Sequence, residues 1–277
     1  IIKMKNRIII IGRRGFLGRN LNLYLKKKFF IINLDYKAFI KKKLNFIKNF
    51  DYIINCTSNK NYIENRYLKK NDFDLTIANK VKELNIKMII LSTRKVYKNG
   101  VNLKETSVLK PTNNYSKNKL KTEKALLKIL KEKILILRIS NVIGLNNKRH
   151  NKLHKTFIDV FFENIKKGII FNNKNSYKDF ISINKFCEIV EKLIIFKSYG
   201  IYNISLGKKI FLKQIIRWLN FYNKEKNIKN VNLLEKYQSD NFTLNNDKLM
   251  DTIKIKNTTQ ELKKYCIKLS NGFFKNV

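Results

Sequence analysis

The sequence is poor in several residue types, and their scarcity narrows the class of protein. It holds three cysteines, Cys56, Cys187 and Cys266, with neither a CxxC pair nor an even set. Neither a disulfide framework nor a thiolate metal site is therefore indicated, which fits a reducing compartment. No apolar run approaches the roughly 18 residues that cross a bilayer, and the first apolar run leads into glycines instead of a cleavage site. We expect a cytoplasmic protein without membrane insertion.

Acidic residues are also scarce, because 20 Asp and Glu accompany 60 Lys and Arg, giving a formal net charge of +40. Such a charge suggests a nucleic acid or an anionic membrane as partner. Only nine of these cations are Arg, however, the side chain whose planar group best suits phosphate and guanine. Ala occurs three times and Pro once, a bias typical of an AT-rich genome. We therefore interpret the charge as solvated surface and do not expect a nucleic-acid partner, although a functional basic face stays the alternative.

Short apolar runs typical of strands in a parallel sheet alternate with segments of helical spacing. The expected strands are 7–12, 29–34, 51–56, 87–91, 134–139 and 201–205, and the expected helices include 17–25, 73–81 and 120–130. This order predicts an α/β fold, a Rossmann-type doubly wound parallel sheet with a small C-terminal substrate-binding cap. We expect the sheet domain to comprise residues 1–148 plus 178–224, and the cap to comprise 149–177 plus 225–277.

The first expected strand leads into Gly12-Arg-Arg-Gly15-Phe-Leu-Gly18 and then into a helix. The first glycine permits a tight turn, the second lets backbone N–H groups approach a pyrophosphate, and the third lets the helix pack against the strand. The N-terminus of the helix adds N–H donors for the phosphates. A plain strand-to-helix turn is the alternative. The motif predicts an NAD(P) site that includes Gly12, Arg14, Gly15, Phe16, Leu17 and Gly18.

Asp35 ends the second expected strand, 17 residues beyond Gly18. A carboxylate there can accept hydrogen bonds from the adenosine ribose and would repel a 2′-phosphate, which favours NAD. Arg14 could reach such a phosphate, so NADP stays possible. A simple turn residue is the alternative role for Asp35.

A Tyr followed by Lys four residues later places both side chains on one helical face, but the pattern is common in a Lys-rich chain. It occurs at Tyr24 and Lys28, at Tyr115 and Lys119, and at Tyr222 and Lys226. Only Tyr115 opens a helix after a polar loop and follows a strand that ends in Ser92-Thr93, at the edge where such sheets bind ligands. The context therefore selects Tyr115 and Lys119.

The chain resembles the extended short-chain dehydrogenases/reductases, the NAD-dependent epimerase/dehydratase family. The resemblance covers nearly the whole chain in order and rests on several stretches together. These are residues 8–18, 51–56, Leu91-Ser-Thr-Arg-Lys-Val-Tyr97, 111–123, 137–144, 179–181, 200–205 and, loosely, 244–249.

The resemblance implies a role for each candidate. Tyr115 would be the acid/base, Lys119 would lower its pKa and hold the nicotinamide ribose, and Thr93 would bond the substrate oxygen. Asn141 would contact the substrate diphosphate, and Thr57 would stand in the cofactor wall. A free phenol titrates near 10, so acting near pH 7 requires about 4 kcal/mol of preferential stabilisation of its anion.

The implied function is an NAD(P)-dependent oxidoreductase acting on a nucleoside-diphosphate sugar, by 4-keto reduction or by epimerisation. The Ser-Thr-x-x-Val-Tyr stretch leans towards reductases similar to dTDP-4-dehydrorhamnose reductase. Arg94 and Lys95 stand where 4,6-dehydratases carry an acidic pair, so we do not expect dehydration. The alternative is a family member that serves as an RNA-binding or assembly protein.

Other features depart from the family or lead elsewhere. Only 15 residues separate Asp35 from Asp51, where the family fits a helix and another strand, so we expect an abbreviated adenine pocket. Asn71 or Asp72 occupies the region of a structural Asn. His150 and His154 share a helical spacing but have no nearby carboxylate or cysteine, and we predict no metal site. We expect Trp218 in the core, and a homodimer through the helices at 73–83 and 117–129.

Overall fold

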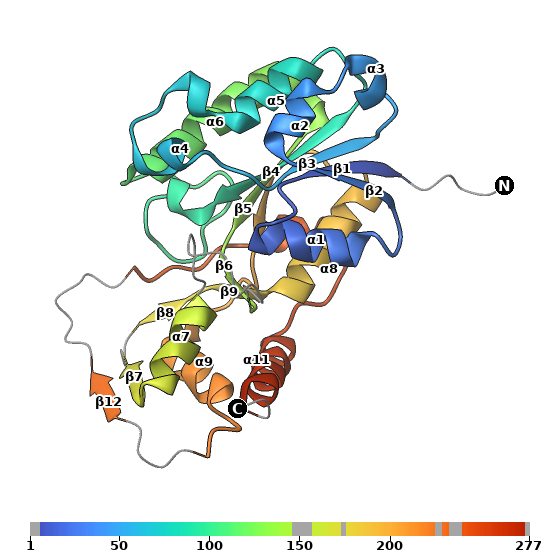
Figure 1. Cartoon of the computed structure of the whole chain (residues 1–277). Coiled ribbons are helices and arrows are strands. Elements are labelled where there is room, and N and C mark those ends of the chain that lie inside the picture. Colours follow the sequence, from blue (N-terminus) through green and yellow to red (C-terminus); the bar gives the residue numbers. More distant parts are fainter. Residues whose placement is uncertain (1–5, 146–156, 173–175, 225–228, 233–239, 275–277) are drawn as a thin grey trace.

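A six-stranded parallel sheet with helices on both faces forms the upper lobe of the molecule (Figure 1). The computed structural model describes residues 6–145, 157–172, 176–224, 229–232 and 240–274. The strand order is β10-β5-β4-β3-β1-β2. Strand β2 therefore lies on one side of β1, and all later strands of the sheet lie on its other side. The strands are β1 (Arg7–Ile11), β2 (Phe30–Leu34), β3 (Tyr52–Asn55), β4 (Lys87–Thr93), β5 (Ile134–Ile139) and β10 (Gly200–Ile204). The predicted Rossmann-type α/β fold is confirmed.

The isoleucines of β1 show why its apolar run is unbroken, since both faces of the sheet are covered. Ile8 and Ile10 belong to one apolar cluster, and Ile9 and Ile11 belong to another. The first cluster includes α1 (Phe16–Leu25), α8 (Ile183–Ile195) and α10 (Asp247–Ile253). The second includes α2 (Tyr36–Lys41), α3 (Leu44–Ile47), α5 (Phe73–Val81) and α6 (Asn114–Leu130).

The lower lobe of the molecule in Figure 1 is built from helices and short strands. It has its own apolar cluster, which contains Trp218 as expected. Its helices are α7 (Phe157–Lys166), α9 (Leu212–Leu219) and α11 (Thr259–Phe274). Its short strands pair as β7 (Ile169–Asn172) with β12 (Lys229–Asn232), and β8 (Tyr177–Lys178) with β11 (Ile210–Phe211). The pair of β6 (Asn141–Ile143) and β9 (Phe180–Ser182) lies where the two lobes meet. The domain boundaries given above remain a proposal. Because α9 packs in the cluster of the lower lobe and α10 packs in a cluster of the sheet, we would assign α9 to the cap and α10 to the sheet domain.

Residues 240–253 run back from the lower lobe to the sheet. Phe242 and Leu244 pack with Val96 and Tyr97 in a small buried cluster. The N–H of Leu103 donates to the carbonyl of Thr243 at 3.0 Å, and α10 then packs beneath the sheet beside α8. Residues 240–253 therefore complete the lobe that the first part of the chain begins.

The segment between Asp35 and Asp51 differs from the pattern that the resemblance implies. It forms the short helices α2 and α3 and contributes no strand, so β2 is the edge of the sheet. This segment thus lacks the further strand, as its 15 residues indicated, and the abbreviated adenine pocket stays a prediction.

Candidate functional site

The glycine turn after β1 has the backbone geometry that its sequence predicts. Gly12 has a φ of +91°, which side chains rarely adopt, and a Cβ there would collide with the Thr57 side chain. A Cβ on Gly18 would collide with the carbonyl of Gly12 and lie 3.0 Å from the Cβ of Cys56. A Cβ on Gly15 would meet no protein atom closer than 3.7 Å. Two glycines therefore serve packing, and Gly15 leaves space open in front of the helix.

The N-terminus of α1 borders a cavity of about 480 Å³, within the range of small-molecule sites. Gly15 is the N-cap, no side chain caps the helix there, and Gly15, Phe16 and Leu17 line the cavity. An uncapped helix N-terminus that borders a cavity suits an anion such as a diphosphate. The residues present therefore fit the phosphates of a dinucleotide.

A second cavity of about 430 Å³ adjoins the first, and Gly15, Cys56, Thr57 and Ser58 line both. Gly12, Arg14 and Asp35 also line the second cavity, so the structure brings these candidates together. Asp35 is exposed, and its Oδ1 accepts a 2.7 Å hydrogen bond from the N–H of Ala38 at the start of α2. Asp35 is thus a helix cap as well as a wall of this cavity. The joined cavities give room for both halves of a dinucleotide.

Tyr115 and Lys119 are positioned by the start of α6. The Asn113 side chain accepts a 2.9 Å hydrogen bond from the N–H of Ser116, and the Ser116 hydroxyl accepts one of 3.4 Å from the N–H of Asn113. These two bonds form a capping box, and the helix begins at residue 114. This start places Tyr115 in the first turn and Lys119 one turn later. Both side chains line the first cavity with the glycine turn. The pairing predicted from the sequence is therefore present in space.

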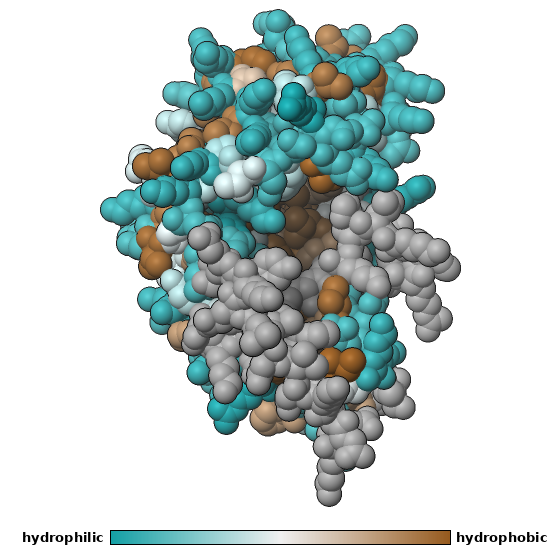
Figure 2. All heavy atoms as spheres, turned by 90° about the vertical axis from the view of Figure 1, so that its left-hand side faces the viewer, coloured by the Kyte–Doolittle hydropathy of each residue, from teal (hydrophilic) through white to brown (hydrophobic). Residues whose placement is uncertain are grey.

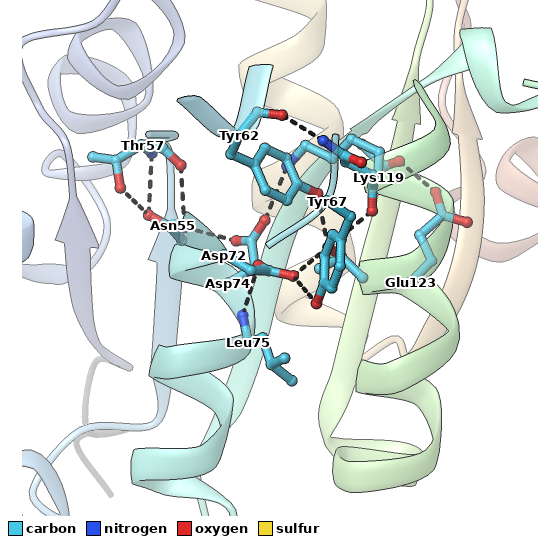
Figure 3. A network of polar contacts seen from close by, with 12 residues as sticks. Asn55, Thr57, Tyr62, Tyr67, Asp72, Asp74, Leu75, Lys119 and Glu123 are labelled. Carbon is cyan, nitrogen blue, oxygen red and sulfur yellow. Dashed lines mark hydrogen bonds and ion pairs between the residues drawn. The ribbon is translucent and has the colours of Figure 1, made fainter. Parts of the chain in front are cut away.

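Lys119 takes part in a buried polar network (Figure 3). Its Nζ donates to Oδ2 of Asp74 at 2.9 Å, and the two side chains are only 3% and 4% exposed. Burial alone would lower the pKa of Lys119, but the negative charge of Asp74, with smaller contributions from Tyr115 and Tyr62, outweighs it, and the net pKa is raised. The other carboxylate oxygen of Asp74 accepts from Nδ2 of Asn55 at 2.6 Å. Oδ1 of Asn55 in turn accepts from the N–H and the hydroxyl of Thr57.

Two expected substrate residues lie outside the described lining of these cavities. Thr93 is half-buried at the end of β4, and its Oγ1 accepts from the N–H of Lys95 at 3.2 Å. Asn141 begins β6, and its N–H donates to the carbonyl of Asp179 at 3.3 Å. Their roles toward a substrate remain proposals.

A second buried ion pair was missed by sequence reasoning. Arg138 on β5 donates to both carboxylate oxygens of Glu123 on α6, and the side chains are 2% and 1% exposed. Glu123 also accepts from the hydroxyl of Ser92, the residue before Thr93. The pair therefore joins α6, which bears Tyr115, to the neighbouring strands β4 and β5. An Arg within an otherwise apolar strand was the available signal.

Arg94, the residue after Thr93, is held in place by contacts within the protein. It is buried, pairs with Asp240, and stacks over the ring of Phe242 with its guanidinium carbon 3.8 Å from the ring centroid. This side chain therefore anchors the returning C-terminal segment to the end of β4.

Three further expectations concern metals, membranes and oligomers. In the described ranges no cluster of His, Cys, Asp and Glu could hold a metal ion, and His150 and His154 lie outside those ranges. Of the helices described, none has the length and apolar character to cross a membrane. Lys117, Lys121 and Lys124 are exposed on α6, as a dimer through that helix requires, but the dimer itself stays a prediction.

The glycine turn, the joined cavities beside it and the Tyr–Lys pair define a dinucleotide-binding α/β protein. The model of the NAD dependent epimerase/dehydratase family matches residues 8–205, and the chain belongs to this family. The family is NAD dependent, which agrees with the cofactor expected from the sequence.

Several solved structures are similar to this chain over almost the entire length of both chains. UDP-N-acetylglucosamine 4-epimerase from Methanobrevibacter ruminantium M1, in complex with UDP-N-acetylmuramic acid, has a TM-score of 0.82 at 19% identity, with 100% of both chains covered. dTDP-glucose 4,6-dehydratase from Bacillus anthracis str. Ames, in complex with NAD, has a TM-score of 0.76 at 17% identity, covering 98% of this chain and 97% of that one. UDP-glucuronic acid 4-epimerase from Bacillus cereus, in complex with NAD, has a TM-score of 0.75 at 16% identity, covering 97% and 99%.

No curated protein matches the sequence. At these identities the structural likeness establishes the fold alone. Because the similar structures include both epimerases and a dehydratase, the expectation against dehydration receives no support from them.

Proposed function

We propose that the protein is an NAD(P)-dependent oxidoreductase that reduces or epimerises a nucleoside-diphosphate sugar. The observation that carries the proposal is the single cavity lined by the glycine turn, Tyr115 and Lys119. Membership of the NAD dependent epimerase/dehydratase family supports it, as do the nucleotide-sugar names of the similar structures.

The cofactor would be held by residues on both sides of the turn. Gly15, Phe16 and Leu17 would hold its diphosphate at the start of α1, Asp35 its adenosine ribose, and Lys119 its nicotinamide ribose. Asp35 makes NAD the favoured form, with NADP still open because Arg14 lines the same cavity. When bound, the nicotinamide supplies or accepts the hydride at the sugar carbon.

Tyr115 would move the proton. In 4-keto reduction its phenol donates a proton to the oxygen of the former ketone, and in the reverse direction its phenolate removes that proton from the carbinol. The ammonium of Lys119 stabilises the phenolate as a nearby opposite charge. The hydroxyl of Thr93 accepts from Lys95, so its own hydrogen stays available to bond the same substrate oxygen.

The reaction proposed is reduction or epimerisation and not dehydration. Dehydration needs an acid for the leaving hydroxyl and a base for the neighbouring carbon. After Thr93 this chain has Arg94, which is committed to Asp240 and Phe242, and then Lys95. Neither is a carboxyl group.

The proposal is tested with Tyr115→Phe, after a thermal-shift screen of NAD, NADP and sugar nucleotides has identified ligands of the folded protein. We expect turnover to fall by at least about 10²-fold, the usual share of acid/base catalysis, with NADH affinity unchanged. The control is Tyr222→Phe, which removes a tyrosine that also precedes a lysine by four residues but lines neither cavity. Equal turnover by both variants would reject the proposed role of Tyr115.

One observation favours a second function, the binding of RNA by a catalytically inactive member. A separate cavity of about 700 Å³ is lined by four cations and, among the described residues, by no acidic one. The cations are Arg66, Lys117, Lys121 and Lys124. Salt-sensitive RNA binding that Tyr115→Phe leaves intact, with no turnover of any sugar nucleotide, would favour this function over the enzyme.

A further inference from the structure

Asp74 is a buried carboxylate on α5 that the chemistry above does not use. It stands among apolar neighbours on the helix face that packs against the sheet, where a charge is costly unless it is paired. Its two oxygens have two different partners, Nζ of Lys119 at 2.9 Å and Nδ2 of Asn55 at 2.6 Å (Figure 3). The carboxylate thus joins α6 to the end of β3.

Lys119 depends on this carboxylate for its charge. A lysine as deeply buried as Lys119 loses its proton readily unless an anion compensates it. The other groups that face Lys119 are Tyr62 from α4, Cys56 after β3 and Tyr115 from its own helix. All three are uncharged when protonated. Among the described residues, Asp74 is the carboxylate within ion-pair distance of Lys119.

We propose that Asp74 is a positioning residue that keeps Lys119 protonated and fixes its ammonium beside Tyr115 at the cavity. The catalytic meaning of this proposal rests on the proposed function. One N–H of the ammonium donates to Asp74. An ammonium has two further N–H groups, and Lys119 lines the cavity, so these would serve a ribose and a phenolate. Because Asn55 binds both Asp74 and Thr57, the same carboxylate also ties the ammonium to the cavity wall.

The ion pair is tested without any ligand by the variant Asp74→Asn. An Asn at this position can still accept from Asn55 but carries no charge, so Lys119 of the folded variant loses its proton below the ordinary lysine pKa. The unfolded chain then binds more protons than the folded one, and the stability of the variant rises with pH up to the ordinary lysine pKa. We expect the melting temperature of the variant to lie several degrees below that of the wild type at pH 7, and this gap to shrink by at least about half at pH 9.5.

The matched control is Asp72→Asn, two residues away. Asp72 is also buried, and it caps α5 and accepts from Tyr67 and Thr122, but it forms no ion pair with Lys119. Its variant should lose stability by an amount that does not change between pH 7 and pH 9.5. A gap for Asp74→Asn that is equally constant would overturn the proposal.

A second measurement tests the link to the cofactor site. NADH fluorescence gives the Kd at pH 7 and at pH 9.5 for the wild type and both variants. We expect Asp74→Asn to lose about tenfold more affinity over this interval than the wild type, because its Lys119 becomes neutral. The same pH dependence in all three proteins would refute a positioning role. A different result would refute the proposed function instead. If the gap in melting temperature between the wild type and Asp74→Asn shrinks at pH 9.5 but the wild type binds no nicotinamide nucleotide, only the ion pair remains.

Discussion

The buried pair of Glu123 and Arg138 lets the cost of one interior charge be worked out from the structure. Glu123→Leu removes the carboxylate that receives three hydrogen bonds from the Arg138 guanidinium, including one of 2.6 Å. Removing one partner of a buried pair costs about 3–5 kcal/mol, because the remaining charge is left without compensation. At this chain length such a loss lowers the melting temperature by about 10 °C. Urea unfolding with an unchanged m-value measures the free energy directly.

Two further variants separate the pair from simple packing. Glu123→Leu combined with Arg138→Met replaces both charges by apolar groups, and it should recover most of the loss. Glu64→Gln breaks the exposed pair of Lys60 and Glu64, whose atoms are 4.0 Å apart, and should cost less than about 0.5 kcal/mol. Salt should leave the large loss unchanged, because ions screen interior charges weakly. A loss of under about 1 kcal/mol for Glu123→Leu, or one that salt halves, would refute the reasoning.

The remaining predictions concern the glycine turn and one buried acid. Gly18→Ala should destabilise the fold by about 1–3 kcal/mol, because its methyl group meets the carbonyl of Gly12. Gly15→Ala should melt close to the wild type yet bind NADH more weakly, and equal NADH affinity would contradict its place at the phosphates. Burial raises the pKa of Asp179 to about 7, although several N–H groups bind its anion. Since the unfolded carboxyl ionises first, stability should fall by about 3 kcal/mol from pH 5 to pH 7.5 relative to Asp179→Asn, and parallel urea-unfolding curves would contradict this.

The strands and helices of the sheet could be predicted closely where apolar residues form an uninterrupted pattern. The strand 134–139 and the helix 73–81 agree with β5 and α5 at both ends. The apolar spacing indicated a helix only over 120–130, whereas α6 begins at residue 114, close to Tyr115, which its context had placed at the opening of a helix. The start is set by the capping box of Asn113 and Ser116. Caps depend on a few polar atoms, which an apolar pattern does not record.

The candidate site could be predicted in its chemistry but not in its supports. Tyr115, Lys119 and the glycine turn were selected from local context, and they line one cavity. The pairing of Lys119 with Asp74 joins residues 45 positions apart, so no local spacing indicates it. A carboxylate within the apolar face of α5 was the visible sign that a buried cation lies opposite.

The return of residues 240–253 to the sheet has a consequence for the synthesis of this protein. A ribosome delivers the glycine turn, Tyr115 and Lys119 long before Phe242 and Leu244 emerge to cover Val96 and Tyr97. A premature stop codon between residues 142 and 240 therefore yields a chain with every proposed catalytic group and an uncovered apolar surface. Such a product would be removed by proteolysis or would aggregate, so nonsense mutations late in the gene should be as damaging as early ones.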